Sequence, residues 1–466
     1  MKNKQKMTRY MMPYLAGCFL LGLVVSCDSF VDVAQPNSQL TSAAVFTDYN
    51  TASAAMKDVF AKMRDVGLMT GRPVGLSHLA GVYTDELVSY QTSATSAYPF
   101  YSNALTATHS YVQDLWNSAY SQIYAANAVL EGVSHSSVLT QVQKNQLTGE
   151  ALFARALLHS YLVGVYGACP YITTTDYQQN VSVSRLPKAQ VYGLCISDLE
   201  EAADLLPENY IGSMRSRPNK FAAKALLARL YLYNGQWAEA SNEASAVINQ
   251  TGLYVWEADL NKVFLKACTG TIWQFSPAGT TGNTQEGALF VFNAGPPPVV
   301  ALSPDLYNAF ETGDLRRTSW IRTITSGVNT WHHAYKYKQG SGNVATTEHS
   351  IVLRLAEQYL IRAEARARQG ELSNAKQDLD FIRANAGLAG TTAVTQAEII
   401  EAVIKERRVE LFTEFGHRFF DLQRTGKLDA VLTPVKVGWN SDDSLWPVPQ
   451  SELLINPNLL PQNAGY

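Results

Sequence analysis

The sequence has little charge. Asp, Glu, Lys and Arg make up 17% of its 466 residues, against about 25% in an average soluble protein. The formal net charge is −3, so the chain lacks the basic excess that draws a protein to nucleic acid. Aromatic residues reach 11%. A surface poor in charge but rich in Tyr, Ser, Thr and Asn suits uncharged partners better than phosphates.

Long apolar runs are also missing, except near the N-terminus. Four basic residues precede an almost uninterrupted apolar stretch over residues 11–25. This arrangement is typical of a secretory signal peptide, and the stretch is too short for a membrane-spanning helix. The stretch ends at Val24-Val25-Ser26-Cys27, which resembles the lipobox of bacterial lipoproteins, where the thiol accepts a diacylglycerol. We therefore predict a signal peptide over 1–26 and lipidation of Cys27; the alternative is an ordinary signal peptide with an incidental cysteine.

Cleavage after residue 26 would remove four basic and no acidic residues. The mature chain would then have 33 basic and 40 acidic residues, a net charge of −7. Of five cysteines, Cys169, Cys195 and Cys268 would remain without lipid. Their wide spacing fits neither a disulfide framework nor a zinc site, so we expect buried small hydrophobic side chains with at most one disulfide bridge.

Apolar residues recur at helical spacing through much of the chain. One stripe runs from Trp116 to Leu130 and another from Leu152 to Tyr166, in steps of three and four, which predicts two amphipathic helices. His159 lies within the second stripe. We expect it to be a hydrogen-bonded core residue rather than a metal ligand.

Two later segments repeat one another. Residues 222–248 and 353–386 each predict a helix, a turn with a central glycine and a second helix. Alignment of the turn glycines matches Ala228 with Ala363 and Ala240 with Ala375, small residues that let helices approach closely. Such a unit of about 34 residues is the tetratricopeptide pattern. We predict a mostly α fold built on a tetratricopeptide-like helical-repeat scaffold.

Two irregular regions interrupt the helices. Residues 67–111 are rich in Gly, Ser, Thr and Tyr, and residues 252–350 contain a triple-proline run. The second region also has short β-type stretches at 271–275 and 288–292. Long insertions on a rigid scaffold often carry binding sites. The predicted organisation is a signal peptide over 1–26 and one domain over 27–466, with helical repeats at about 113–251 and 351–425 and binding insertions at about 67–111 and 252–350.

Signatures of catalysis are scarce. The sequence contains no His-Glu-x-x-His, no Gly-x-Ser-x-Gly and no phosphate-binding Gly-x-x-x-x-Gly-Lys-Ser/Thr. The adjacent acids Asp85-Glu86 and Asp442-Asp443 are typical of solvated turns. A glycosidase, however, needs only two carboxyl groups about 5–10 Å apart, which spacing in sequence does not exclude.

Two further clusters are interpreted as structural. His332 and His333 have no third ligand at a suitable spacing, so we expect polar loop residues and no metal or cofactor. A charged helix over 398–415 places Arg408 within its apolar stripe. A buried arginine must pair with a carboxylate, so we predict a structural ion-pair network there and no catalytic residues.

The irregular regions are dense in aromatic residues. The apolar C–H faces of a sugar pack on aromatic planes, and Tyr combines such a plane with a hydroxyl group. We expect most of these rings to seal loops onto the scaffold and the remainder to contact a ligand. The candidate ligand-binding residues are Tyr90, Tyr98, Tyr101, Asn103, Trp273, Trp320 and Trp331.

Short motifs follow one another in a specific order over nearly the whole chain. They include Thr84-Asp85-Glu86-Leu87, Leu115-Trp116-Asn117, Tyr166-Gly167-Ala168-Cys169-Pro170, Glu406-Arg407-Arg408-Val409-Glu410, Trp446-Pro447-Val448-Pro449 and the closing Gln462-Asn463-Ala464-Gly465-Tyr466. Together with the lipobox, these motifs resemble the SusD/RagB-type nutrient-uptake lipoproteins of Bacteroidetes.

The resemblance implies a lipid-anchored protein on the outer face of the outer membrane. It also implies a partner, a SusC-like TonB-dependent transporter over which the protein closes as a lid. The usual cargo is an oligosaccharide, and some relatives take peptides. We expect non-catalytic capture of oligosaccharides. The alternatives are a peptide-binding lipoprotein of the same family, a surface glycoside hydrolase and an interaction scaffold without a small ligand.

Overall fold

The computed structural model describes residues 42–279, 282–340 and 345–466. The predicted signal peptide and Cys27 lie outside the described residues. Residues 45–466 belong to one compact unit, and it is this unit that is described below. Among the described residues, no helix is long and apolar enough to cross a membrane. Cys169, Cys195 and Cys268 are buried, as expected, and all three are free thiols.

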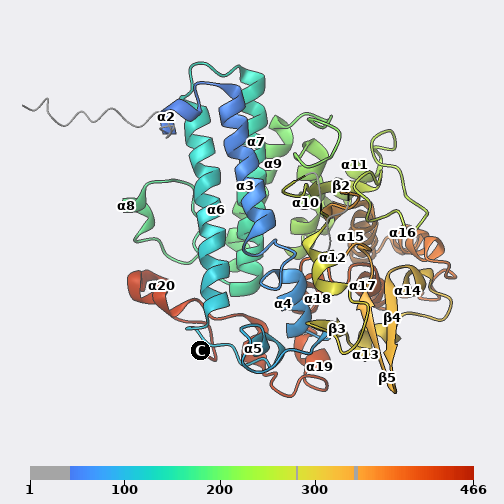
Figure 1. Ribbon diagram of the computed structural model, residues 1–466. Coiled ribbons are helices and arrows are strands. Elements are labelled where there is room, and N and C mark those ends of the chain that lie inside the picture. Colours follow the sequence, from blue (N-terminus) through green and yellow to red (C-terminus); the bar gives the residue numbers. More distant parts are fainter. Residues whose placement is uncertain (1–41, 280–281, 341–344) are drawn as a thin grey trace, which may run out of the picture. The chain divides into compact units, whose positions relative to one another are not determined.

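Long helices that follow one another in the chain pack against one another (Figure 1). α3 packs on α6, α6 on α7, α7 on α9, α9 on α10 and α10 on α11, after which α11 contacts α15. The bounds of the long helices are α3 Tyr49–Asp65, α6 Ser110–His135, α7 Gln141–Tyr166, α9 Lys188–Leu205, α10 Lys220–Tyr233, α11 Trp237–Ile248, α15 Leu355–Arg368, α16 Leu372–Asn385 and α17 Gln396–Glu410. A short helix, α2 (Ser42–Val45), precedes them in the sequence.

The two predicted helix pairs are confirmed as α10–α11 and α15–α16. Gly235 and Gly370 occupy the turns with φ of +77° and +83°, a conformation that favours glycine at a helix end. Ala228 and Ala363 are fully buried. Since α11 packs on α15, the two pairs stack as tetratricopeptide units do.

Side-chain caps explain several helix starts. Thr140 and Thr395 each form a capping box, with Gln143 and Glu398 respectively, which satisfies backbone N–H groups that the helix leaves unpaired. Asn219 caps α10 by accepting a hydrogen bond from the Ala222 N–H.

Three sequence predictions of local structure were wrong. The second repeat begins as a strand, so its helix starts at Leu355. The charged helix ends at Glu410, because Thr413, Phe415 and Gly416 adopt positive φ. The 288–292 stretch is mostly helical: α12 (Gln285–Phe290) is capped by the Thr284 hydroxyl.

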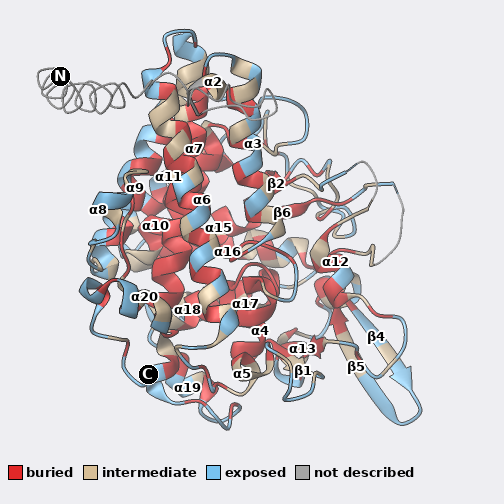
Figure 2. Cartoon of the chain, turned by 60° about the vertical axis from the view of Figure 1, so that its left-hand side comes forward, coloured by how far each residue is buried: buried red, intermediate tan, exposed pale blue. Residues whose placement is uncertain are grey.

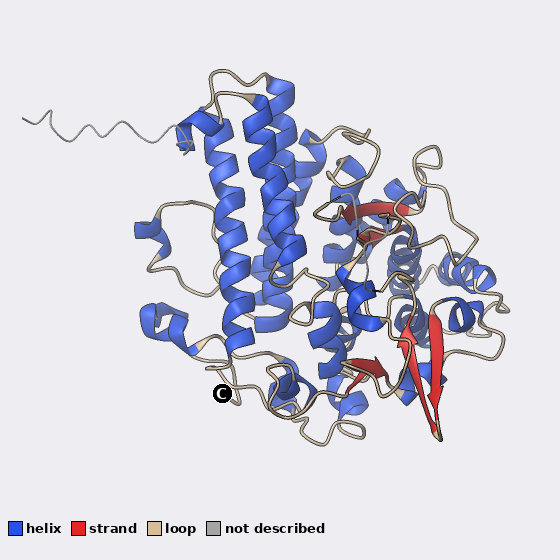
Figure 3. Cartoon of the chain, in the orientation of Figure 1, coloured by secondary structure: helices blue, strands red, loops and turns tan. Residues whose placement is uncertain are grey.

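Among the described residues, six short strands form three two-stranded antiparallel sheets (Figure 3). β1 (Leu87–Ser89) pairs with β3 (Val300–Leu302) and thereby joins the two irregular insertions. β2 (Thr271–Phe275), the predicted strand, pairs with β6 (Ser350–Arg354), and β4 (Ile321–Ser326) pairs with β5 (Asn329–Ala334). The remaining short helices are α4 Leu76–Tyr83, α5 Tyr98–Tyr101, α8 Tyr177–Asn180, α13 Pro304–Ala309, α14 Leu315–Ser319, α18 His417–Arg424, α19 Leu428–Leu432, η1 Ser441–Ser444, α20 Gln450–Ile455 and η2 Pro457–Leu459.

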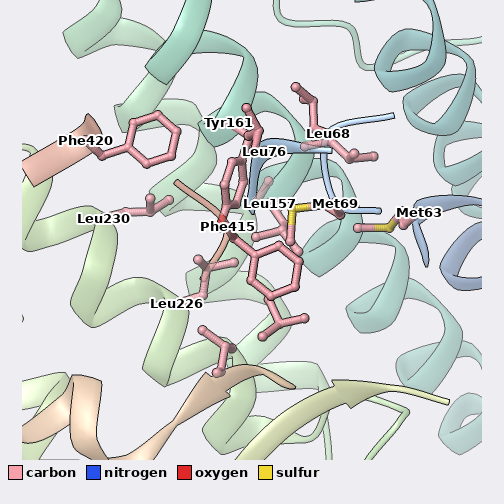
Figure 4. Close-up of a cluster of buried hydrophobic side chains, with 14 of the residues drawn as sticks. Met63, Leu68, Met69, Leu76, Leu157, Tyr161, Leu226, Leu230, Phe415 and Phe420 are labelled. Carbon is pink, nitrogen blue, oxygen red and sulfur yellow. The ribbon is translucent and has the colours of Figure 1, made fainter. Parts of the chain in front are cut away.

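The core runs between the long helices and continues under the insertions (Figure 2). Figure 4 shows one part of it, where α7 and α10 meet the segment that follows α17: Leu157, Leu226 and Phe415 lie together and are buried. The β4–β5 hairpin, in contrast, is largely exposed over residues 322–330. His159 lies in the core as predicted, and its Nε2 accepts a hydrogen bond from the Ile172 N–H at 3.1 Å.

Candidate functional site

Four of the seven predicted binding residues form a cluster at the surface. The ring of Tyr90 meets that of Trp331 edge to face, with centroids 6.5 Å apart, and Tyr98 meets Tyr101 in the same way at 6.0 Å. Burial raises the pKa of Tyr101. The two pairs are neighbours, because α5, which carries Tyr98 and Tyr101, contacts β1, the strand that directly precedes Tyr90. We call these four residues the aromatic row. Tyr90 is 41% exposed and the other three are half-buried.

Backbone pairing between the insertions positions Tyr90 and Trp331. The Tyr90 N–H donates to the Val299 carbonyl at 2.9 Å, which extends the β1–β3 ladder by one residue. β3 in turn contacts β5, the strand that carries Trp331. Gly295 lets the Trp331 ring approach the backbone, because a Cβ atom at this position would lie 2.0 Å from the ring.

An ion cluster holds the start of β1. Arg418 donates twice to the Asp85 carboxylate at 2.8 Å, and Arg408 donates to it at 2.6 Å. Burial alone would raise the pKa of Asp85, but Arg418 and Arg408 lower it below its usual value. The prediction of a solvated turn was therefore wrong for Asp85 and Glu86, which are both buried. Burial and the neighbouring Asp85 charge raise the pKa of Glu86 to about 7.

Tyr98 and Tyr101 are the first and last residues of α5, and Pro99 lies in its first turn. The Lys436 Nζ lies 4.3 Å from the centre of the Tyr101 ring and donates to the carbonyls of Val82 and Tyr101. Burial lowers the pKa of Lys436 to about 8. Lys436 was not predicted, because no local pattern connects it to a loop more than 300 residues earlier.

Asn103 is not part of this surface cluster. It is buried, adopts a φ of +50° just after α5, and its Nδ2 donates to the Tyr83 carbonyl at 3.1 Å. Asn103 was predicted to bind a ligand, but the structure buries it, and it fixes the turn that follows α5.

Trp273 and Trp320 were also predicted to bind a ligand, but both are core residues. Trp273 is fully buried between Phe60 and Phe153, and its Nε1 donates to the Ser216 carbonyl. Trp320 is 1% exposed, and its Nε1 donates to the Leu260 carbonyl. Because both rings are buried, they seal the second insertion onto the scaffold.

A second aromatic stack lies on the other face of the β4–β5 hairpin. His332 stacks on Tyr307 with ring centroids 3.5 Å apart, and the Arg317 guanidinium lies 4.0 Å over the same tyrosine ring. The predicted loop histidines thus belong to strand β5, and His333 is buried. In the described part of the chain, no group of three or more His, Cys, Asp or Glu side chains could hold a metal ion.

The charged cluster after residue 398 is an ion-pair network, as predicted. Glu410 pairs with both Arg316 and Arg354, and Glu414 pairs with Arg354 and Lys336, all of them buried. Although burial opposes ionisation, these cations lower the pKa of Glu410 to about 2. The network joins α17 to the second insertion and contributes to the position of the β4–β5 hairpin.

These observations define a helical-repeat protein whose two insertions share an aromatic surface. Residues 29–232 match a family described as starch-binding and associating with the outer membrane, and residues 304–466 match the SusD family. The chain belongs to the SusD family.

Relatives of known sequence cover most of the chain. It is 28% identical to SusD-like protein P2 of Formosa agariphila, over 76% of this chain and 81% of that protein. It is 25% identical to SusD-like protein P25 of the same organism, over 76% and 79%.

Solved structures share the fold. A SusD superfamily protein of Bacteroides vulgatus has a TM-score of 0.78 at 19% identity, covering 90% of this chain and 99% of that chain. A laminarin-binding SusD-like protein has a TM-score of 0.75 at 24% identity, with the same coverage. Surface glycan-binding protein A of Bacteroides uniformis also has a TM-score of 0.75, at 20% identity over 90% of this chain and 100% of that chain.

Proposed function

We propose that this chain is a non-catalytic surface protein that captures oligosaccharides on the aromatic row and delivers them to a TonB-dependent outer-membrane transporter. The observation that carries the proposal is that rings from both insertions meet at the surface. Tyr90, Tyr98 and Tyr101 come from the first insertion and Trp331 from the second. A chain of sugar units offers successive apolar faces, which a row of rings matches better than a single ring does.

The relatives support a carbohydrate as the ligand. Two proteins of the same fold are a laminarin-binding protein and a surface glycan-binding protein, and one matching family is described as starch-binding. Low charge and high aromatic content agree with an uncharged, hydroxyl-rich ligand. In this proposal lipidation of Cys27 anchors the protein at the cell surface, next to a SusC-like transporter.

The experiment that tests the proposal is calorimetric titration with laminarin, soluble starch and further polysaccharides. For the glycan that binds, we expect Tyr90→Ala and Trp331→Ala to weaken affinity by about 5- to 150-fold each, by analogy with base–aromatic stacking. Tyr177→Ala is the matched control, because this exposed tyrosine on α8 is not part of the row. Wild-type affinity in both row variants would contradict the site.

Two further outcomes test the other parts of the proposal. Release of shortened products during incubation with the bound glycan would contradict a non-catalytic role. Cys27→Ala should lose lipidation and retention in the outer-membrane fraction. Retention together with uptake of labelled fatty acid would contradict the anchor.

A further inference from the structure

An apolar groove is lined by residues of α6, α8 and α20. Figure 1 shows α8 and α20 on the side of α6 away from the β4–β5 hairpin. It encloses about 450 Å³ of open space. Four large apolar side chains that line it are exposed: Tyr177 by 75%, Ile455 by 68%, Val181 by 55% and Tyr124 by 54%. Isolated exposed apolar residues are normal, but a contiguous group of them marks an interaction site.

The groove is held open by hydrogen bonds within the chain. Gln113 on α6 donates to the Ser451 hydroxyl and so fixes α20 against α6. Asn456 donates to the Val183 carbonyl, which fixes the segment after α20 against the chain that follows α8. Tyr120 donates to the Pro170 carbonyl. The walls are therefore formed before any partner binds, which lowers the ordering cost of binding.

Glu452 is the one charged residue among those that line the groove. Across the described ranges its carboxylate forms no hydrogen bond and no ion pair, and partial burial raises its pKa. A carboxylate beside tyrosine rings complements a guanidinium group, which forms paired hydrogen bonds with the acid and packs on aromatic faces. The surrounding apolar side chains complement an apolar neighbour of that cation.

We propose that this groove is a docking site for a polypeptide segment that presents an arginine between apolar side chains. Arginine and aromatic residues are enriched where protein interfaces gain most of their energy, and charged residues are otherwise depleted there. No residue of the aromatic row lines the groove. Failure of glycan binding therefore leaves this proposal intact, and the two can be tested separately.

The test uses the intact protein and a fluorescein-labelled peptide, Gly-Leu-Phe-Arg-Leu-Phe-Gly, in a fluorescence anisotropy titration. A matched peptide carries citrulline, the neutral isostere of arginine. We expect the arginine peptide to bind about tenfold tighter or more, the size of a charge-assisted hydrogen bond. Glu452→Gln should abolish this preference. Glu201→Gln makes the same charge change at an exposed position on α9 and should keep it.

Further variants test the apolar walls. Tyr124→Ala and Tyr177→Ala should weaken both peptides while thermal melting stays close to that of the wild type. Equal affinity for the two peptides, or no binding of the arginine peptide at millimolar concentration, would overturn the proposal. A dimer seen in sedimentation and broken by Tyr177→Ala would also overturn it, since the occupant would then be a second copy. Displacement of the peptide by a bound glycan would identify the groove as a sugar site instead.

Discussion

Trp273 and Trp331 come from the same insertion, but the structure uses their rings differently. Trp273 lies in β2, a strand in which every residue is buried, and it packs between rings of the scaffold. Trp331 lies in β5, where burial changes from exposed to buried along the strand, and its ring stays half-exposed beside Tyr90. The difference shows that the packing around a strand, rather than the residue type, decides whether an aromatic ring is buried in the core or stays accessible to a ligand.

The largest expected effect is on the free energy of unfolding, which should differ strongly between variants of these two tryptophans. Trp273→Ala removes a fully buried ring and its hydrogen bond, so we expect a loss of about 3–5 kcal/mol in the free energy of unfolding. Trp331→Ala should lose less than about 1 kcal/mol, because its ring is partly hydrated already. Denaturant unfolding of both variants measures the contrast. Similar losses for the two would show that Trp331 is a core residue.

A pH series extends the comparison to histidines. Burial lowers the pKa of His159 to about 3 from its usual 6.5, so the folded state resists its protonation. The contribution of neutral His159 to the free energy of unfolding is complete above pH 6.5. It is lost as the pH falls towards 3, by at most about 1.4 kcal/mol per pH unit. His159→Gln should therefore flatten the fall in melting temperature below pH 6.5. His332→Gln, at the half-buried surface stack, should change the slope much less.

The repeat interface should respond to added volume. Ala228 and Ala363 are fully buried in matched helices, so Ala228→Leu and Ala363→Leu should each cost about 1–3 kcal/mol through overpacking. Ala384→Leu is the control, because Ala384 is exposed on α16. Melting temperatures that match the control would show that the repeats do not pack at these residues.

The smallest expected effect concerns the position of the Trp331 ring against Gly295. In Gly295→Ala the new methyl group would overlap the ring, so the ring must shift away from its present position. We expect glycan affinity to fall by less than in Trp331→Ala, with little change in stability. Gly193→Ala is the control, since no atom lies within 4 Å of its added Cβ. Unchanged affinity in Gly295→Ala would show that ring position is not critical.

Sequence periodicity was enough to predict the helical scaffold. The stripes that end in Leu130 and Tyr166 became α6 and α7, because burial at every third or fourth residue leaves a clear pattern. Short apolar runs carry no such pattern: residues 271–275 formed a strand, whereas residues 288–292 belong mostly to a helix. The Thr284 cap was the signal that distinguishes the second case.

The sequence indicated that the candidate site contains aromatic residues, but not which aromatic residues lie at the surface. Aromatic content nominated both Trp320 and Trp331, and only the packing of Phe264 and the Leu260 carbonyl around Trp320 separates them. Asp85 and its partners Arg408 and Arg418 are more than 300 residues apart. Contacts of this range depend on the tertiary fold, and a single sequence carries no local trace of them.

The most direct test of the glycan site is hydroxyl-radical footprinting of the intact protein, with and without the glycan that calorimetry identifies. We expect the glycan to protect Tyr90, Tyr98, Tyr101 and Trp331, while Tyr124 and Tyr177 react as before. Oxidation of the aromatic row at the same rate in the presence of saturating glycan would contradict it.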